Sequence, residues 1–299
     1  ATPSVSYTYD AIYPRVATMV DGTGTTAYTY HPAGQLGAGQ VASVDGPLTD
    51  DTITYSYDEL GRVVTRAING AANTVTWAFD ALGRVTTETN VLGTFTYTYD
   101  GVTSRLATVT YPNGQTSTYS YLPANQDRRL QTIHHRYPNA VTLSKFDYTY
   151  DAAGNILTWR QQADTMAVLW KYGYDAADQL TRAVKHATDP SETVLQRYAY
   201  AYDPAGNRTV EQIDDRVTLS SYDHLNRLTA QTPGGPLVVA GLLNEPGTVT
   251  IAGVPATVDA ANTFRGTVPT GAGVHTVTIV ARDAAGNETS QAFAVPVTG

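Results

Sequence analysis

The chain has 299 residues, of which 15% are charged, and its 19 Lys and Arg against 27 Asp and Glu give a net charge of −8. This balance excludes a basic nucleic-acid-binding surface as the default interpretation. The absence of cysteine excludes disulfides, thiolate nucleophiles and Cys-ligated zinc. No segment approaches the roughly 18 apolar residues of a membrane helix, so we expect no membrane span.

An internal repeat dominates the chain from residue 7 onward. Its pattern is aromatic-x-aromatic-Asp-x-x-Gly-Arg, as in Tyr55, Tyr57, Asp58, Gly61 and Arg62. The Asp position recurs ten times between residues 10 and 223, with a mean period of about 24 residues, which is typical of repeat architectures. Three further clear copies contain Trp77, Phe79, Asp80, Gly83 and Arg84; Tyr148, Tyr150, Asp151 and Gly154; and Tyr200, Tyr202, Asp203 and Gly206.

Each repeat predicts one β-hairpin. Tyr7 and Tyr9 lie two residues apart and share one face of a strand, while Thr8 faces the other way. The Asp carboxylate then accepts the backbone N–H two residues on, and the Gly closes the turn in a left-handed conformation. We therefore expect positive φ at Gly61 and Gly83. Ten hairpins predict an all-β fold with about twenty strands in one antiparallel sheet.

The recurring tyrosines are interpreted as packing residues of this sheet, because they return at the same position in most repeats. Stacked hairpins place them in an aromatic ladder of cross-strand pairs. Phe79 replaces one tyrosine, so we expect the hydroxyl to serve no shared polar function. The chain has sixteen Arg and three Lys, a preference that favours stacking on Tyr and bidentate pairing with Asp. A sugar-binding platform is the alternative for any single tyrosine.

Trp159 and Trp170 flank residues 160–169, the least repeat-like stretch of the array. Two interpretations remain for this pair. The rings pack on the face of the sheet, or they face solvent and bind a glycan.

A composition change after Tyr222 predicts a second domain, since no Tyr or Trp follows it. Residues 232–236 are rich in Pro and Gly and are interpreted as a turn, so the boundaries are 1–232 for the repeats and 233–299 for a small β-sandwich. Six or seven short alternating strands are expected in the sandwich, which we expect to fold alone. Its predicted core is Val249, Ile251, Phe264, Val277, Ile279, Phe293 and Val295.

Motifs of known enzymes are missing from the sequence, including the nucleophile elbow, the zinc-binding His-Glu-x-x-His helix and glycine-rich phosphate loops. His134 and His135 are adjacent on a predicted strand and point to opposite faces, which disfavours a shared metal. Asp283 opens a second copy of the Asp-Ala-Ala-Gly-Asn turn found at residues 151–155, and calcium binding there is the alternative to a plain turn. We expect no catalytic residue, metal or cofactor.

The repeats resemble the YD repeats of the Rhs family, which also occur in the chamber-forming component of insecticidal Tc toxins and in teneurins. The resemblance covers about residues 5–228 and rests on the Tyr-x-Tyr-Asp-x-x-Gly-Arg-Val units. It implies a long β-sheet that spirals into a hollow shell, in large secreted or cell-surface proteins, and in the toxin branches the shell encloses a C-terminal effector. Residues 237–297 are similar to bacterial immunoglobulin-like modules, which act as spacers, adhesive units or decorations.

The expected function is a non-enzymatic structural segment of a secreted or bacterial cell-surface protein, forming a β-sheet wall, shell or filament. The alternatives are a glycan-binding or cell-adhesion module and part of a toxin-encapsulating Rhs shell, although no C-terminal effector is recognised in this sequence. The chain begins without Met, so we interpret it as part of a longer protein. Expected partners are further repeats of the parent chain, like copies through sheet edges such as residues 6–9, and, for an adhesion module, surface glycans.

Overall fold

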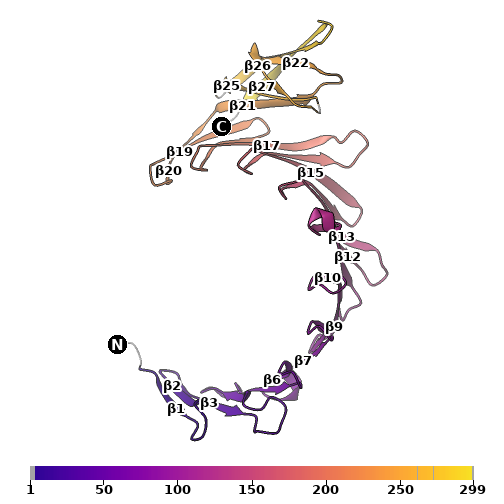
Figure 1. The fold of residues 1–299 in the computed structure, drawn as a ribbon. Helices are drawn as coiled ribbons and strands as arrows, with labels where there is room; N and C mark the ends of the chain where they lie inside the picture. The colour runs from indigo at the N-terminus through magenta and orange to yellow at the C-terminus, as the bar shows by residue number, and fades with distance from the viewer. Residues whose placement is uncertain (1–3, 261, 272, 298–299) are drawn as a thin grey trace. The chain divides into compact units, whose positions relative to one another are not determined.

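The repeats form one 20-stranded sheet, β1–β20, in the computed structural model, which describes residues 4–260, 262–271 and 273–297. The chain falls into two units, Ala1–Lys145 and Phe146–Gly299. In both units consecutive strands are joined as hairpins (Figure 1). The expected all-β array of about twenty strands is therefore confirmed.

The first unit contains twelve complete strands and two short 3-10 helices. These are β1 (Ser6–Tyr9), β2 (Val16–Asp21), β3 (Gly24–Tyr30), β4 (Val41–Asp45), β5 (Ile53–Tyr57), β6 (Val63–Ile68), η1 (Ala71–Asn73), β7 (Thr74–Phe79), β8 (Val85–Asn90), β9 (Gly93–Tyr99), β10 (Leu106–Thr110), β11 (Thr116–Tyr121), η2 (Ala124–Gln126) and β12 (Leu130–Arg136).

The second unit continues the array after β13 (Thr142–Tyr150), the strand in which the unit boundary lies. Its remaining repeat strands are β14 (Ile156–Ala163), β15 (Met166–Tyr174), β16 (Leu180–Ala187), β17 (Val194–Tyr202), β18 (Arg208–Ile213), β19 (Arg216–Tyr222) and β20 (Leu228–Pro233).

The hairpin turns have the predicted geometry. In the turn between β5 and β6 the Gly61 N–H donates to the Asp58 carbonyl, and the Asp58 N–H donates to the Arg62 carbonyl, each at 3.0 Å. The strand register shifts by a bulge between Ser56 and Tyr57. Gly61 has φ +74° and Gly83 has φ +82°, so the predicted left-handed glycines are confirmed. Residues with a Cβ rarely adopt this conformation.

The two faces of the sheet carry different side chains. The tyrosines of each Tyr-x-Tyr pair lie on one face, as the two-residue period of a strand requires. On the other face, hydroxyl side chains pair across neighbouring strands. These hydrogen bonds join Thr8 to Thr18, Thr29 to Ser43 and Thr149 to Thr158, each at 2.6 Å.

Seven further strands form two small sheets at the end of the second unit. The three-stranded sheet has the order β21 (Gly235–Leu242), β25 (Thr263–Thr270) and β24 (Thr257–Val258); the four-stranded sheet has the order β23 (Val254–Pro255), β22 (Gly247–Ile251), β26 (Gly273–Asp283) and β27 (Glu288–Val297).

The junction between the repeats and these sheets is shorter than predicted. Residues 232–236 do not form a turn, because β20 runs to Pro233 and β21 begins at Gly235. Only Gly234 separates the strands, with φ +87° and its N–H donating to the Val217 carbonyl at 2.9 Å. A Cβ at Gly235 would lie 2.8 Å from Cγ of Leu219, so the chain leaves the array through two positions that need glycine. The domain boundary at residue 232 stays a prediction.

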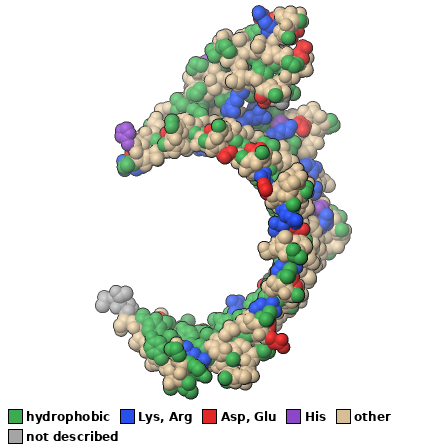
Figure 2. All heavy atoms as spheres, viewed as in Figure 1, with side chains coloured by type: hydrophobic (Ala, Val, Ile, Leu, Met, Phe, Trp, Pro, Cys, Tyr) green, Lys and Arg blue, Asp and Glu red, His purple; other side chains and the backbone are tan. Residues whose placement is uncertain are grey.

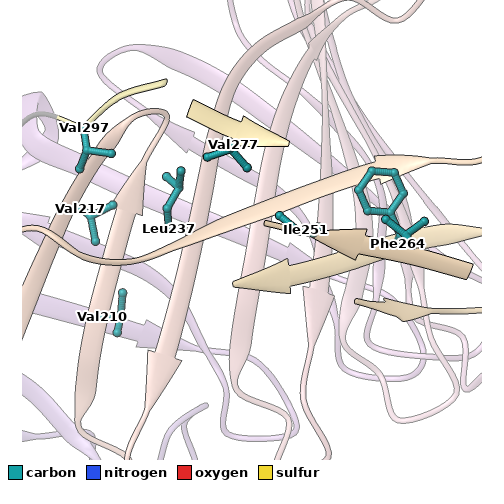
Figure 3. Close-up of a cluster of buried hydrophobic side chains, with 8 residues drawn as sticks. Val210, Val217, Leu237, Ile251, Phe264, Val277 and Val297 are labelled. Atoms are coloured by element: carbon teal, nitrogen blue, oxygen red, sulfur yellow. The ribbon is translucent and has the colours of Figure 1, made fainter. Parts of the chain in front are cut away.

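One hydrophobic core spans this junction (Figure 3). Val210 of β18 and Val217 of β19 are buried with Leu237 of β21 and with the small sheets. The Gln212 amide also joins the two parts, since its Oε1 accepts the Val238 N–H at 2.6 Å and its Nε2 donates to the Val238 carbonyl at 3.2 Å. The last repeats thus supply part of the core that the sequence assigns to the sandwich alone.

Most of the predicted sandwich core is confirmed. Val249, Ile251, Phe264 and Val277 are buried, and Ile279 and Val295 are partly buried against them. The prediction that Phe293 is a core residue is wrong, because its side chain is 41% exposed. It lies on β27, the edge strand of its sheet within the described residues, so only one neighbouring strand covers it.

Candidate functional site

Five repeats among the described residues use an Asp to hold the turn and the following Arg. Asp80 Oδ1 accepts the backbone N–H groups of Leu82 and Arg84 at 2.9 and 3.0 Å, and Oδ2 accepts Nε of Arg84 at 2.7 Å. The backbone N–H of Arg84, opposed by partial burial and helped by the Arg84 guanidinium, holds the pKa of the Asp80 carboxyl below its ordinary value. Where Asn replaces Arg, as at Asn155, its amide donates to the same carboxylate, here Asp151 at 3.1 Å.

The Arg of one repeat also contacts the next repeat. The Arg84 guanidinium, already paired with Asp80, lies 4.4 Å from the centre of the Tyr99 ring. Such cation–π contacts are favourable within about 6 Å. The same contact joins Arg15 to Tyr30, Arg62 to Phe79 and Arg105 to Tyr121, at 4.1–5.3 Å.

The second tyrosine of a repeat completes the joint with its hydroxyl. Tyr57 Oη donates to the Val41 carbonyl at 2.9 Å, and Val41 begins the return strand of the preceding repeat. At least seven of the described tyrosines make this bond, at 2.6–3.1 Å. They are Tyr30 to Val16, Tyr57 to Val41, Tyr99 to Val85, Tyr121 to Leu106, Tyr174 to Ile156, Tyr202 to Leu180 and Tyr222 to Arg208.

This bond corrects the expectation that the hydroxyl has no shared role. Phe79 suggested that expectation, yet Phe79 is a substitution within a common scheme and keeps only the contact with Arg62. We call the three contacts together the repeat interlock: the Asp–Arg pair within a repeat, the Arg on the next repeat's second aromatic ring, and that residue's hydroxyl on the earlier carbonyl. The recurrence of the second tyrosine 14 to 22 residues after the acceptor residue is the sequence signal for it.

The predicted signature residues all occupy the interlock or its aromatic face. In the two repeats that keep the full pattern, Tyr57 and Phe79 are the second aromatics that contact the preceding repeat. Asp58 pairs with Arg62 and Asp80 pairs with Arg84. Gly61 and Gly83 close the turns. Tyr55, Trp77, Tyr148 and Tyr200 are first aromatics of their pairs; Tyr150 and Tyr202 are second aromatics; Asp151, Gly154, Asp203 and Gly206 form the corresponding turns.

Burial raises the pKa of several tyrosine hydroxyls on this face. Burial raises the pKa of Tyr172 to about 12, with smaller contributions from Tyr174 and Tyr148. Burial also raises the pKa of Tyr57 and Tyr200. The hydroxyls of Tyr57, Tyr172 and Tyr200 are therefore un-ionised over the physiological pH range.

Trp159 and Trp170 lie directly opposite each other on β14 and β15, within a continuous aromatic cluster. Trp159 is stacked with Tyr148 at 6.1 Å, and Trp170 is stacked with Tyr172 at 6.2 Å. Lys185 lies 5.8 Å from the Trp170 ring centre. Both indoles are half-buried, so they belong to the packed face, and glycan binding by this pair stays a prediction.

The other candidate positions have different surroundings. His135 Nδ1 lies 2.6 Å from the Ser117 hydroxyl, whereas His134 Nε2 lies 2.9 Å from that of Thr142. Asp283 accepts the Asn287 backbone N–H and side-chain amide, which repeats the arrangement at Asp151. Across the described ranges no group of three or more potential metal ligands comes together.

Two strands lie at the edges of the sheet. Among the described residues β1 pairs with β2 and β20 pairs with β19, and neither has a second neighbour. Tyr7 and Tyr9 are 51% and 64% exposed. The side chain of Arg227, which pairs with Asp223 in the last repeat, is 71% exposed, against 19% for Arg84 inside the array.

Comparison with known proteins places this geometry in context. Residues 79–116 match the family model for the RHS Repeat. The crystal structure of TcdB2-TccC3-TEV matches 95% of this chain at 15% identity, with a TM-score of 0.52, and this chain spans 18% of that one. A crystal structure of TcdB2-TccC3 aligns with 99% of this chain and 22% of its own at 14% identity, but its TM-score of 0.35 adds no argument. Comparison with curated proteins gives no match.

The matched residues 79–116 include the contact of Arg84 with Tyr99 and the bond from Tyr99 to the Val85 carbonyl. The TcdB2-TccC3-TEV match extends over nearly the whole chain and shows a shared fold. The described residues contain no helix with the length and apolar character needed to cross a membrane. Residues 79–116 are therefore similar to an RHS repeat, and the chain shares its fold with part of TcdB2-TccC3-TEV.

Proposed function

We propose that this chain is a non-enzymatic structural segment of a large secreted or cell-surface YD-repeat protein, in which the hairpins form a β-sheet wall. The repeat interlock is the observation that carries the proposal. Its tyrosine bond recurs in both units, from Tyr57 to Val41 and from Tyr174 to Ile156, and its contacts direct polar groups of a repeat to its own turn or to its neighbour. A catalytic constellation needs groups left available to a substrate.

The repeated carboxylates illustrate this use of polar groups. Asp58 and Asp80 each accept two backbone N–H groups and one guanidinium. Hydrogen bonding to the ionised form keeps these carboxylates charged at neutral pH, and a proton transfer would break the turn that they hold. These carboxylates recur at regular positions because they hold the hairpin turns of the sheet.

Two measurements test the proposal on the full chain. Esterase, glycosidase and peptidase substrates should show no turnover, and a reproducible activity abolished by one side-chain change would overturn it. Arg62→Ala combined with Arg84→Ala should expose the joints around β6–β9 to proteolysis. Arg66→Ala is the matched control, because Arg66 lies on β6 outside the interlock. If all variants are equally sensitive to protease, the interlock does not hold the wall together, which would contradict the proposal.

Part of a toxin-enclosing shell is a second candidate, favoured by the fold shared with TcdB2-TccC3-TEV. We also infer that the seven C-terminal strands are an immunoglobulin-like decoration of the wall. Replacing residues 236–299 by a short linker in the parent protein tests the inference that these strands are a decoration. A decoration permits the repeats to assemble without it, whereas loss of the assembled repeat array would show that these strands belong to the wall.

A further inference from the structure

A cavity of about 380 Å³ lies in the second unit between the repeat strands and the first small sheet. Strands β15–β18 line one side, and β21 and β25 line the other. Figure 2 shows Lys and Arg side chains gathered where the C-terminal strands meet the repeats. Pockets of this volume are typical of small-molecule sites.

The lining of the cavity is cationic. It includes Arg182, Arg197, Arg265 and Lys171, and it includes no Asp or Glu. Lys171 is paired with Glu192 at the rim. None of the three arginines forms an ion pair with any described residue, in contrast to the arginines of the interlock. Three positive charges therefore face one cavity without a protein counter-charge.

The inner part of the cavity is also short of hydrogen-bond partners. Nε of Arg182 and Nε2 of His186 are buried and make no hydrogen bond among the described residues. Arg265 Nη2 donates to the Thr181 carbonyl at 3.2 Å, and burial, followed by the charge of Arg182, lowers the pKa of Arg265. His186 Nδ1 donates to the Glu192 carbonyl at 2.8 Å, so Nε2 of the neutral ring is an acceptor and Arg182 Nε is the buried donor without a partner. Such a donor is costly, so a ligand that accepts hydrogen bonds and carries negative charge would satisfy Arg182 Nε and balance the charge of the arginines.

The shape of the donors narrows the ligand class. Guanidinium groups present a planar fork that matches the oxygens of phosphate or carboxylate in a bidentate manner. Val184, Val238 and Leu242 add apolar walls beside the charges, which leaves room for a non-ionic part of a ligand. We propose that this cavity binds a small phosphate-bearing molecule, with Arg182, Arg197 and Arg265 holding the phosphate oxygens.

Calorimetric titration of the full chain tests the proposal at fixed ionic strength, because salt screens such contacts. The probes are inorganic phosphate, pyrophosphate and glucose 6-phosphate, with glucose and citrate as the neutral and carboxylate comparisons. We expect binding of at least one phosphate probe and none of glucose. Tighter binding of glucose 6-phosphate identifies a phosphate ester as the source of the phosphate, and tighter binding of the inorganic probes identifies the free anion.

Variants locate the binding. Arg182→Gln and Arg197→Gln should each weaken the best phosphate probe by about tenfold or more. Arg197 is exposed on β17, so we expect Arg197→Gln to fold normally. This variant therefore tests the site even if Arg182→Gln fails to fold. Arg66→Gln removes a surface arginine in the first unit and should leave the affinity unchanged. The proposal is overturned if no phosphate probe binds, if citrate binds as tightly as pyrophosphate, if Arg197→Gln has no effect, or if Arg66→Gln weakens binding equally.

Discussion

Removal of one hydroxyl from the repeat interlock gives the sharpest test of how the array is held. Tyr57→Phe deletes the 2.9 Å hydrogen bond from Tyr57 Oη to the Val41 carbonyl. Tyr57 is only 8% exposed, so little water can replace the lost donor. A neutral hydrogen bond contributes about 0.5–1.5 kcal/mol net, and a carbonyl left without its donor in a water-poor site lies toward the upper end. We expect Tyr57→Phe to cost about 1 kcal/mol, which raises the local opening equilibrium about fivefold.

Tyr55→Phe is the matched control, because the Tyr55 ring lies on the same strand and its hydroxyl makes no hydrogen bond among the described residues. Hydrogen exchange followed by mass spectrometry on peptides from β4–β6 measures local opening directly, which matters because repeat arrays need not unfold in one step. Faster exchange confined to Tyr57→Phe supports the interlock. Equal effects of the two variants, or no effect of Tyr57→Phe, would refute the reasoning.

Three other perturbations have expected outcomes. Gly61→Val should lower the urea midpoint more than Thr65→Val in the adjoining strand, because valine resists the φ of +74°; equal midpoints would contradict the turn geometry. Burial raises the pKa of Tyr172 to about 12, so the folded chain binds more protons than the unfolded chain between about pH 10 and 12. Stability, present in full below that window, should fall as the pH rises through it, and Tyr172→Phe should reduce the slope in urea titrations. Val217→Ala removes two methyl groups from a fully buried site and should cost about 2 kcal/mol; loss of amide protection in β21 as well as β19 would confirm the shared core, and loss in β19 alone would exclude it.

The hairpins could be predicted from the sequence because turn chemistry and strand period are local properties. Asp58, Gly61 and Arg62 predict their turn within five residues, and the structure places them accordingly. The contact of Arg62 with Phe79 follows from the register between hairpins, which no single repeat contains. The excess of arginine indicated stacking on aromatic rings, yet it did not identify which ring each guanidinium contacts.

The junction was the least predictable part. Val210 and Val217 have the same character as other strand valines, and only the packing of β21 against β18 and β19 makes them core residues. Arg182 and Arg265 are 83 positions apart, and their approach depends on the same packing. A basic cavity built from such distant residues leaves no local pattern in a chain whose net charge is negative.

The direction of the tyrosine bond has a consequence for synthesis. Each of the seven tyrosine hydroxyls named above donates to a carbonyl that precedes it, 14 residues earlier for Tyr30 and 22 for Tyr202. A polypeptide leaves the ribosome with its N-terminus first, so each acceptor exists before its donor emerges. Contacts over such short separations close quickly, and folding during translation proceeds domain by domain or unit by unit. The array is thus suited to vectorial folding, in which each finished hairpin is the template for the next and only the newest one is incomplete.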